Sequence, residues 1–79
     1  MSYAIRITET TDLGIAMLIA EFKTGAYVPV SSVVNLQEAR EIARSHSANT
    51  PSSEKRPRLY RVWARGREGA YESVAEIAL

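Results

Sequence analysis

The residues best suited to chemistry are three alternating side chains in the segment RLYRVWAR, residues 58–65. Side chains two positions apart on a strand point to the same face of a sheet, so Arg61, Trp63 and Arg65 are expected to share one face. Trp and Arg are enriched at the centres of binding sites. Further arginines flank this segment on both sides. The sequence therefore predicts a partner-binding site formed by Arg56, Arg58, Arg61, Trp63, Arg65 and Arg67.

Charge is distributed unevenly along the 79-residue chain, whose formal net charge is only +1. Residues 1–54 hold four bases and six acids, whereas residues 55–79 hold six bases and three acids. All six of those bases fall between positions 55 and 67, with no acid among them. This asymmetry predicts a protein partner with an acidic surface, for example within a nucleoprotein complex.

A purely structural interpretation of the same face stays open. Across the following hairpin, Arg65 can reach Glu72, and Arg61 can reach Glu72 and Glu76. Trp63 would then cover Val74. On this interpretation the face is a sheet surface that pairs its own charges, and exposed pairs of this kind contribute little to stability.

Catalytic groups are scarce. His46 is the only histidine and falls on the apolar side of a predicted helix, where a packed, hydrogen-bonded role is expected. The chain has no cysteine, and a single histidine is too few to build a zinc site. The four glycines do not form a phosphate-binding motif. The sequence therefore predicts no catalytic residues, no metal site, no cofactor and no enzymatic activity.

The first part of the chain has the character of strands. Residues 3–8 alternate apolar and polar side chains, which predicts a half-buried strand. Residues 15–23 are apolar on both faces, which favours a strand in the middle of a covered sheet over the alternative of a helix capped by Asp12. Residues 26–34 form an extended segment that Pro29 restricts to an edge strand or an irregular stretch.

An amphipathic helix is predicted over residues 36–46. Asn35 is a favourable N-cap, and Glu38 three residues later completes a capping box. Apolar side chains then recur at helical spacing on one side, with charged side chains on the other. A Ser- and Pro-containing loop, residues 47–57, follows this helix.

The segment from residue 58 to residue 77 predicts a hairpin that reverses at GREG, residues 66–69. Folding about this turn pairs Arg65 with Ala70, Trp63 with Glu72, Arg61 with Val74, and Leu59 with Glu76. The outer face then carries Trp63 between the arginines. The opposite, core face carries Tyr60, Val62, Ala64, Tyr71, Ala75 and Ile77.

Together these elements predict a single α+β domain over residues 1–79, in which one helix packs on an antiparallel sheet of four or five strands. The order along the chain is two strands, a further short strand, the helix and two strands. No internal repeat is expected. The predicted core joins two groups of side chains: Leu36, Ala39, Ile42 and Ala43 of the helix, and Ile5, Ile7, Leu18, Val62 and Tyr71 of the sheet.

In size and class the chain resembles the small phage-encoded inhibitors of host defence, the anti-CRISPR proteins. This resemblance rests on a compact, cysteine-free α+β unit without catalytic groups. It implies a non-enzymatic, stoichiometric inhibitor or adaptor that occludes a surface on a nucleic-acid-handling protein complex. The alternative is a small module that binds DNA or RNA directly, with arginines on phosphates and Trp63 stacked on a base.

The expected environment is the cytoplasm of a bacterial host. The longest apolar run, residues 15–20, is far too short to cross a bilayer, so no membrane association is predicted. A monomer and a homodimer are both compatible with the sequence, whose apolar content of 46% is ample for a compact core.

Overall fold

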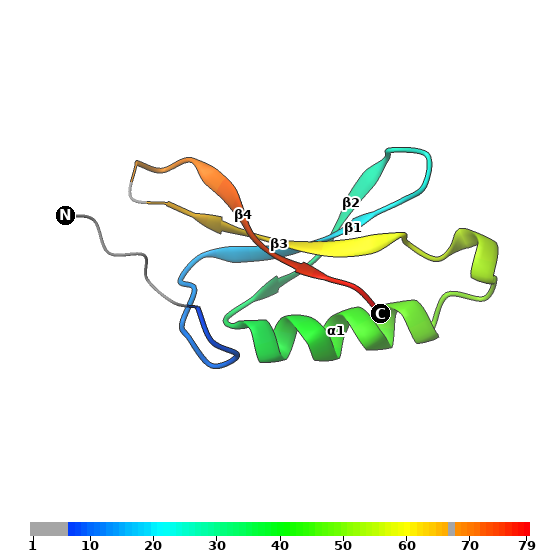
Figure 1. Cartoon of the computed structure of the whole chain (residues 1–79), viewed down its shortest axis with the longest axis horizontal. Coiled ribbons are helices and arrows are strands. Elements are labelled where there is room, and N and C mark those ends of the chain that lie inside the picture. The colour runs from blue at the N-terminus through cyan, green and yellow to red at the C-terminus, as the bar shows by residue number, and fades with distance from the viewer. Residues whose placement is uncertain (1–6, 67) are drawn as a thin grey trace.

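The computed structural model describes residues 7–66 and 68–79, and its elements confirm the predicted α+β fold (Figure 1). One α-helix packs on a single sheet of four strands. In chain order the elements are β1 (Ala16–Glu21), β2 (Tyr27–Val33), α1 (Leu36–Ala48), the short 3-10 helix η1 (Ser53–Lys55), β3 (Leu59–Arg65) and β4 (Tyr71–Ile77).

The sheet is antiparallel, with the strand order β2-β1-β3-β4. The strand interpretation of residues 15–23 is confirmed as β1, an inner strand. Residues 26–34 form the full strand β2, which occupies an edge as Pro29 requires. The predicted strand over residues 3–8 lies mostly outside the described residues, and Ile7 and Thr8 do not belong to a strand.

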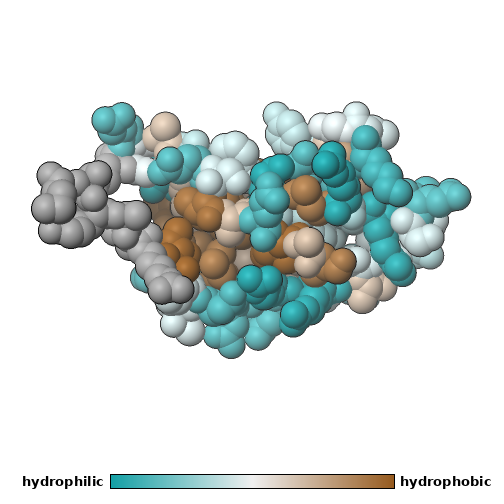
Figure 2. Space-filling view, in the orientation of Figure 1, coloured by the Kyte–Doolittle hydropathy of each residue, from teal (hydrophilic) through white to brown (hydrophobic). Residues whose placement is uncertain are grey.

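Helix α1 begins as the capping pattern predicts. The side chain of Asn35 accepts a hydrogen bond of 2.9 Å from the backbone N–H of Glu38. This bond satisfies one of the donors left free at a helix start. The helix continues to Ala48, two residues beyond the predicted end. Figure 2 shows apolar side chains gathered between the strands and α1, with hydrophilic side chains along the outer side of the helix.

The core lies between α1 and one face of the sheet. Its buried side chains are Ala16, Leu18, Ala20, Val33, Leu36, Ala39, Ala43, Tyr60, Val62, Ala64 and Ile77. The predicted contributions of Leu18 and Val62 are confirmed, and Ile42 and Ile7 pack partly buried against this cluster. Ile5 lies outside the described residues. The prediction for Tyr71 is wrong, because this side chain is 50% exposed.

A β-bulge explains the misplacement of Tyr71. In the observed register Trp63 pairs with Ser73 and Val62 with Ala75, so Val74 is an extra residue on β4. All four predicted pairs are therefore wrong: Arg65–Ala70, Trp63–Glu72, Arg61–Val74 and Leu59–Glu76. An extra residue shifts the alternation of a strand by one position. As a result, the residues of β4 before the bulge lie on the opposite faces from those predicted.

The two hairpins of the sheet, β1–β2 and β3–β4, have the same turn conformation and the same strand pairing. Gly25 and Gly69 each donate a backbone hydrogen bond to the carbonyl three residues earlier, at 2.9 and 3.0 Å. Both glycines have positive φ angles, +90° and +84°, which favour glycine. The second strand of each hairpin contains one extra, bulged residue at the equivalent position: Val30 in β2 and Val74 in β4. The expectation of no internal repeat is therefore wrong.

This repeat has an offset of 44 residues and is visible in the sequence. The segment GAYVPVSSV of residues 25–33 corresponds to GAYESVAEI of residues 69–77. The same burial pattern follows along β2 and β4. Because β1 and β3 pair antiparallel between the two edges, the hairpins are related by an approximate two-fold rotation.

The core assignment predicts the effect of shortening Leu18, which has no exposed surface. We expect Leu18→Ala to lower the free energy of unfolding by about 2–4 kcal/mol, because it removes apolar contacts and leaves a cavity. Urea denaturation followed by circular dichroism measures this loss. As the matched control, Ile15→Ala alters a side chain that is 59% exposed and should change stability by about 0.5 kcal/mol or less. Equal losses in the two variants would contradict the one-sided core.

Candidate binding face

The structure separates the five described residues of the predicted site. Arg61 and Trp63 occupy the middle of β3, and Arg65 is its last residue. Arg56 and Arg58 precede β3, next to η1. Arg67 lies outside the described residues. With a rise of about 3.3 Å per residue, the backbones of Arg58 and Arg65 are about 23 Å apart, so the described arginines do not form one continuous basic patch.

Arg61 is fixed by two carboxylates. Its Nε donates to Oε2 of Glu21 at 2.6 Å, and its Nη1 donates to Oε1 of Glu76 at 2.6 Å. The hydrogen bond that Arg61 donates to Glu21, and after it the one that it donates to Glu76, raises the pKa of Arg61 above its ordinary value. The ion pair with Glu76 agrees with the self-paired interpretation of this face. The three groups together carry a formal charge of −1.

Arg65 lacks the partner expected for it. The predicted pair with Glu72 does not form between these described residues, because the bulge places Glu72 opposite Ala64, in register with the core face. The guanidinium of Arg65 lies over the turn instead. Its Nη2 is 3.4 Å from the position that a Cβ on Gly69 would occupy. The charge of Arg65 therefore sits at the end of the sheet.

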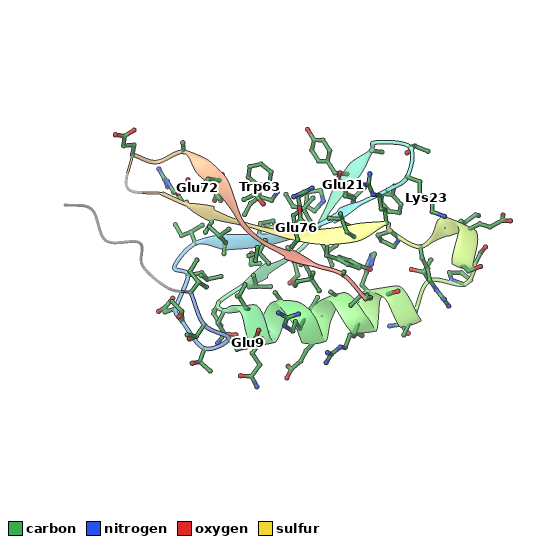
Figure 3. The ribbon with its side chains drawn as sticks, viewed as in Figure 1. Glu9, Glu21, Lys23, Trp63, Glu72 and Glu76 are labelled. Carbon is green, nitrogen blue, oxygen red and sulfur yellow. The ribbon has the colours of Figure 1, made fainter. Side chains whose placement is uncertain are left out.

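The face of the sheet away from α1, here called the open face, carries an apolar row. Cross-strand pairing places Tyr27, Ile19, Trp63 and Tyr71 on successive strands. Each is displaced by two residues along the strand direction from the one before it, so together they form a diagonal. These four residues, here called the diagonal stripe, line a hollow of about 290 Å³. Figure 3 shows Trp63 standing on the side of the sheet opposite α1.

The two sides of the diagonal stripe differ in charge. On one side lies the ion-paired chain Glu21–Arg61–Glu76. The register places Met17, Pro29 and Ile15 on the other side, together with one charged residue, Arg65, whose guanidinium lies over the turn at Gly69. Figure 1 shows the turns of both hairpins curving away from α1, so the stripe lies between two raised ends. The open face is therefore a concave apolar surface with one acidic flank.

Sequence reasoning missed three residues of this surface: Tyr27, Tyr71 and Ile19. Both tyrosines follow the Gly-Ala pair of the repeated turn, and that repetition is the signal that identifies them. Ile19 and Trp63 are also equivalent in the two hairpins, 44 positions apart. The stripe thus consists of two related pairs, and the repeat in the sequence is the signal that relates them.

His46 is packed, as expected. Its Nδ1 lies 2.8 Å from the hydroxyl of Tyr60, in a hydrogen bond. The two rings meet edge to face, with centroids 5.6 Å apart. The imidazole therefore has a structural partner in the core.

Within residues 7–66 and 68–79, His, Asp and Glu side chains nowhere gather in the groups of three or more that a metal ion requires. In the same part of the chain, no helix combines the length and the apolar character needed to cross a membrane. No family model, curated protein or solved structure matches the chain.

The burial of Tyr60 predicts a loss of stability in alkali. Burial raises the pKa of its phenol above the ordinary value of 10.0, and the nearby Ser47 hydroxyl offsets this only in part. The unfolded chain therefore ionises Tyr60 first. The contribution of this group to stability is complete below about pH 10 and is lost as the pH rises through the folded-state pKa.

We expect the free energy of unfolding to fall more steeply between about pH 9.5 and 11 in the wild type than in Tyr60→Phe, which cannot ionise. Urea titrations at several pH values measure both slopes. Ile15→Ala is the control, because it alters an exposed side chain without removing a titrating group, and its slope should equal that of the wild type. If the slope of Tyr60→Phe also equals that of the wild type, the predicted linkage is absent.

Proposed function

We propose that this chain is a non-catalytic binding protein, a stoichiometric inhibitor or adaptor whose open face docks on a protein partner. The observation that carries the proposal is that α1 covers only one of the two faces of the sheet. Helix α1 buries one face, while the other carries the half-buried Trp63 between the exposed Tyr27 and Tyr71. Trp and Tyr at the centre of a surface are typical of binding hot spots, and grouped exposed aromatics mark interaction sites.

The edges of the sheet are poorly suited to binding by strand addition. Each edge strand contains a bulge, which interrupts the row of backbone donors and acceptors. Pro29 removes a further donor from β2, and the exposed Glu72 and Glu76 lie on β4. Bulges, prolines and charged side chains are devices that keep edges unpaired. Docking on the face is therefore favoured over docking on an edge.

Charge on the open face favours a protein over a nucleic acid. A base stacked on Trp63 would bring phosphates close to Glu21 and Glu76. The arginine beside Trp63 is already neutralised by these two carboxylates. Arg56, Arg58 and Arg65 lie towards the ends of the sheet, where they can meet acidic groups at the margins of a protein partner.

The resemblance to anti-CRISPR proteins adds a class of target to this proposal. Members of that group often act by occupying a surface on a nucleic-acid-handling complex. The size of the chain and its single α+β domain support the comparison. We propose that the protein acts by occlusion in the cytoplasm of a bacterial host.

Replacing Trp63 tests the docking face. We expect Trp63→Ala to raise the Kd for the partner by about 30-fold or more, because it removes the central aromatic contact. The partner is captured from a lysate of the source organism, purified, and titrated calorimetrically against the wild type and the variant. The result expected is one-to-one binding that depends on Trp63.

Glu41→Ala, on the exposed side of α1, is the matched control and should bind like the wild type. Circular dichroism establishes that both variants are folded. Equal binding by Trp63→Ala and the wild type would overturn the proposal. Salt-sensitive binding of short oligonucleotides in place of a protein would favour the nucleic-acid alternative.

A further inference from the structure

We infer that the partner segment seated on the diagonal stripe is a basic amphipathic helix, with apolar side chains on the stripe and Lys or Arg beside Glu21 and Glu76. This inference rests on the proposed function and specifies the chemistry of the partner. It differs from the acidic partner that the arginine count predicts, because it follows the charges that the open face presents.

The length and shape of the stripe suit a helix. Tyr27 and Tyr71 lie on the two edge strands and at opposite ends of the sheet, so the stripe spans about 25 Å for strands 4.8 Å apart with a rise of about 3.3 Å per residue. A helix of about 16 residues has the same length. Its apolar side chains recur every turn and can follow the four residues of the stripe. The raised hairpin turns would lie at its two ends.

The acidic flank determines the charge of that helix. Glu76 is bound to Arg61 through one oxygen, and its side chain is 61% exposed, so the carboxylate remains accessible. Glu21 shares the same arginine, which leaves the group of three with a charge of −1. A helix crossing the stripe therefore meets net negative charge along one side. On the other side it meets mainly uncharged groups, with the single charge of Arg65 displaced to the turn at Gly69.

The aromatic rings reinforce this preference. Among the described residues, no cation–π contact occupies the rings of Trp63, Tyr27 or Tyr71. Arg61 is directed to its carboxylates and Arg65 to the turn. An incoming Lys or Arg close to Trp63 gains a cation–π contact in addition to its ion pair.

Two synthetic peptides test the inference, with Trp63 as the reporter because it is the only tryptophan of the chain. Both have about 16 residues and the same leucines at helical spacing, and their remaining positions are all Lys in one and all Glu in the other. At about 20 mM salt we expect the Lys peptide to shift the Trp63 emission and to bind at least about tenfold more tightly than the Glu peptide. The net charge of +1 opposes this preference, so a positive result reports the local charge of the face.

Charge reversal at one carboxylate provides the matched pair of variants. We expect Glu76→Lys to lose the preference for the Lys peptide, because the acidic flank becomes basic. Glu41→Lys changes the net charge by the same amount on the exposed side of α1 and should keep the preference. Thermal unfolding confirms that both variants are folded, since Arg61 retains Glu21 when Glu76 is replaced.

The other outcomes overturn the inference. An unchanged Trp63 emission with both peptides, equal binding of the two peptides, or preference for the Glu peptide would each contradict it. Light scattering that shows a dimer dissociated by Trp63→Ala would identify a second copy of the chain as the occupant. If peptide binding fails while capture of a partner still depends on Trp63, the proposed function stands and the inference alone is wrong.

Discussion

The structure depends on the pairing of β1 with β3, the one ladder of the sheet that runs without a shift in register. Because this ladder is regular, the alternation of side chains along β1 matches that along β3. Leu18 lies opposite Val62 on the face under α1, and their neighbours Ile19 and Trp63 point to the other face. One ladder therefore positions both the core and the surface opposite to it. Because the chain supplies a single long helix among the described residues, only one of these faces is covered.

Local patterns in the sequence are sufficient to predict most of the fold. The capping residues of α1, the two apolar faces of β1 and the edge position imposed by Pro29 each follow from side chains within a few residues. The bulge at Val74 could not be predicted in this way, because the alternation along β4 alone is compatible with either register. Its effect is large, since it moves Tyr71 from the predicted core to the open face.

The candidate site was less predictable than the fold because its charges are settled by contacts between distant residues. Arg61 and Glu21 are 40 positions apart and meet only after β1 and β3 pair. A count of arginines in the sequence treats every one of them as available to a partner. In the folded chain Arg61 is neutralised, while Arg58 and Arg65 lie at opposite ends of β3. The sequence identifies Trp63 correctly as an outward residue but not the polarity of its surroundings.

The repeated hairpin design also has a consequence for how the chain folds. Each hairpin closes through a turn of a few residues, so its contacts are local and form with little loss of chain entropy. The ladder between β1 and β3 instead joins residues about 40 positions apart, with α1 in the intervening chain. Contacts at such separation are slow to form, because a long loop must be ordered first. The association of the two hairpins is therefore expected to limit the rate of folding, and helix α1 holds the halves together in the folded chain by packing on both.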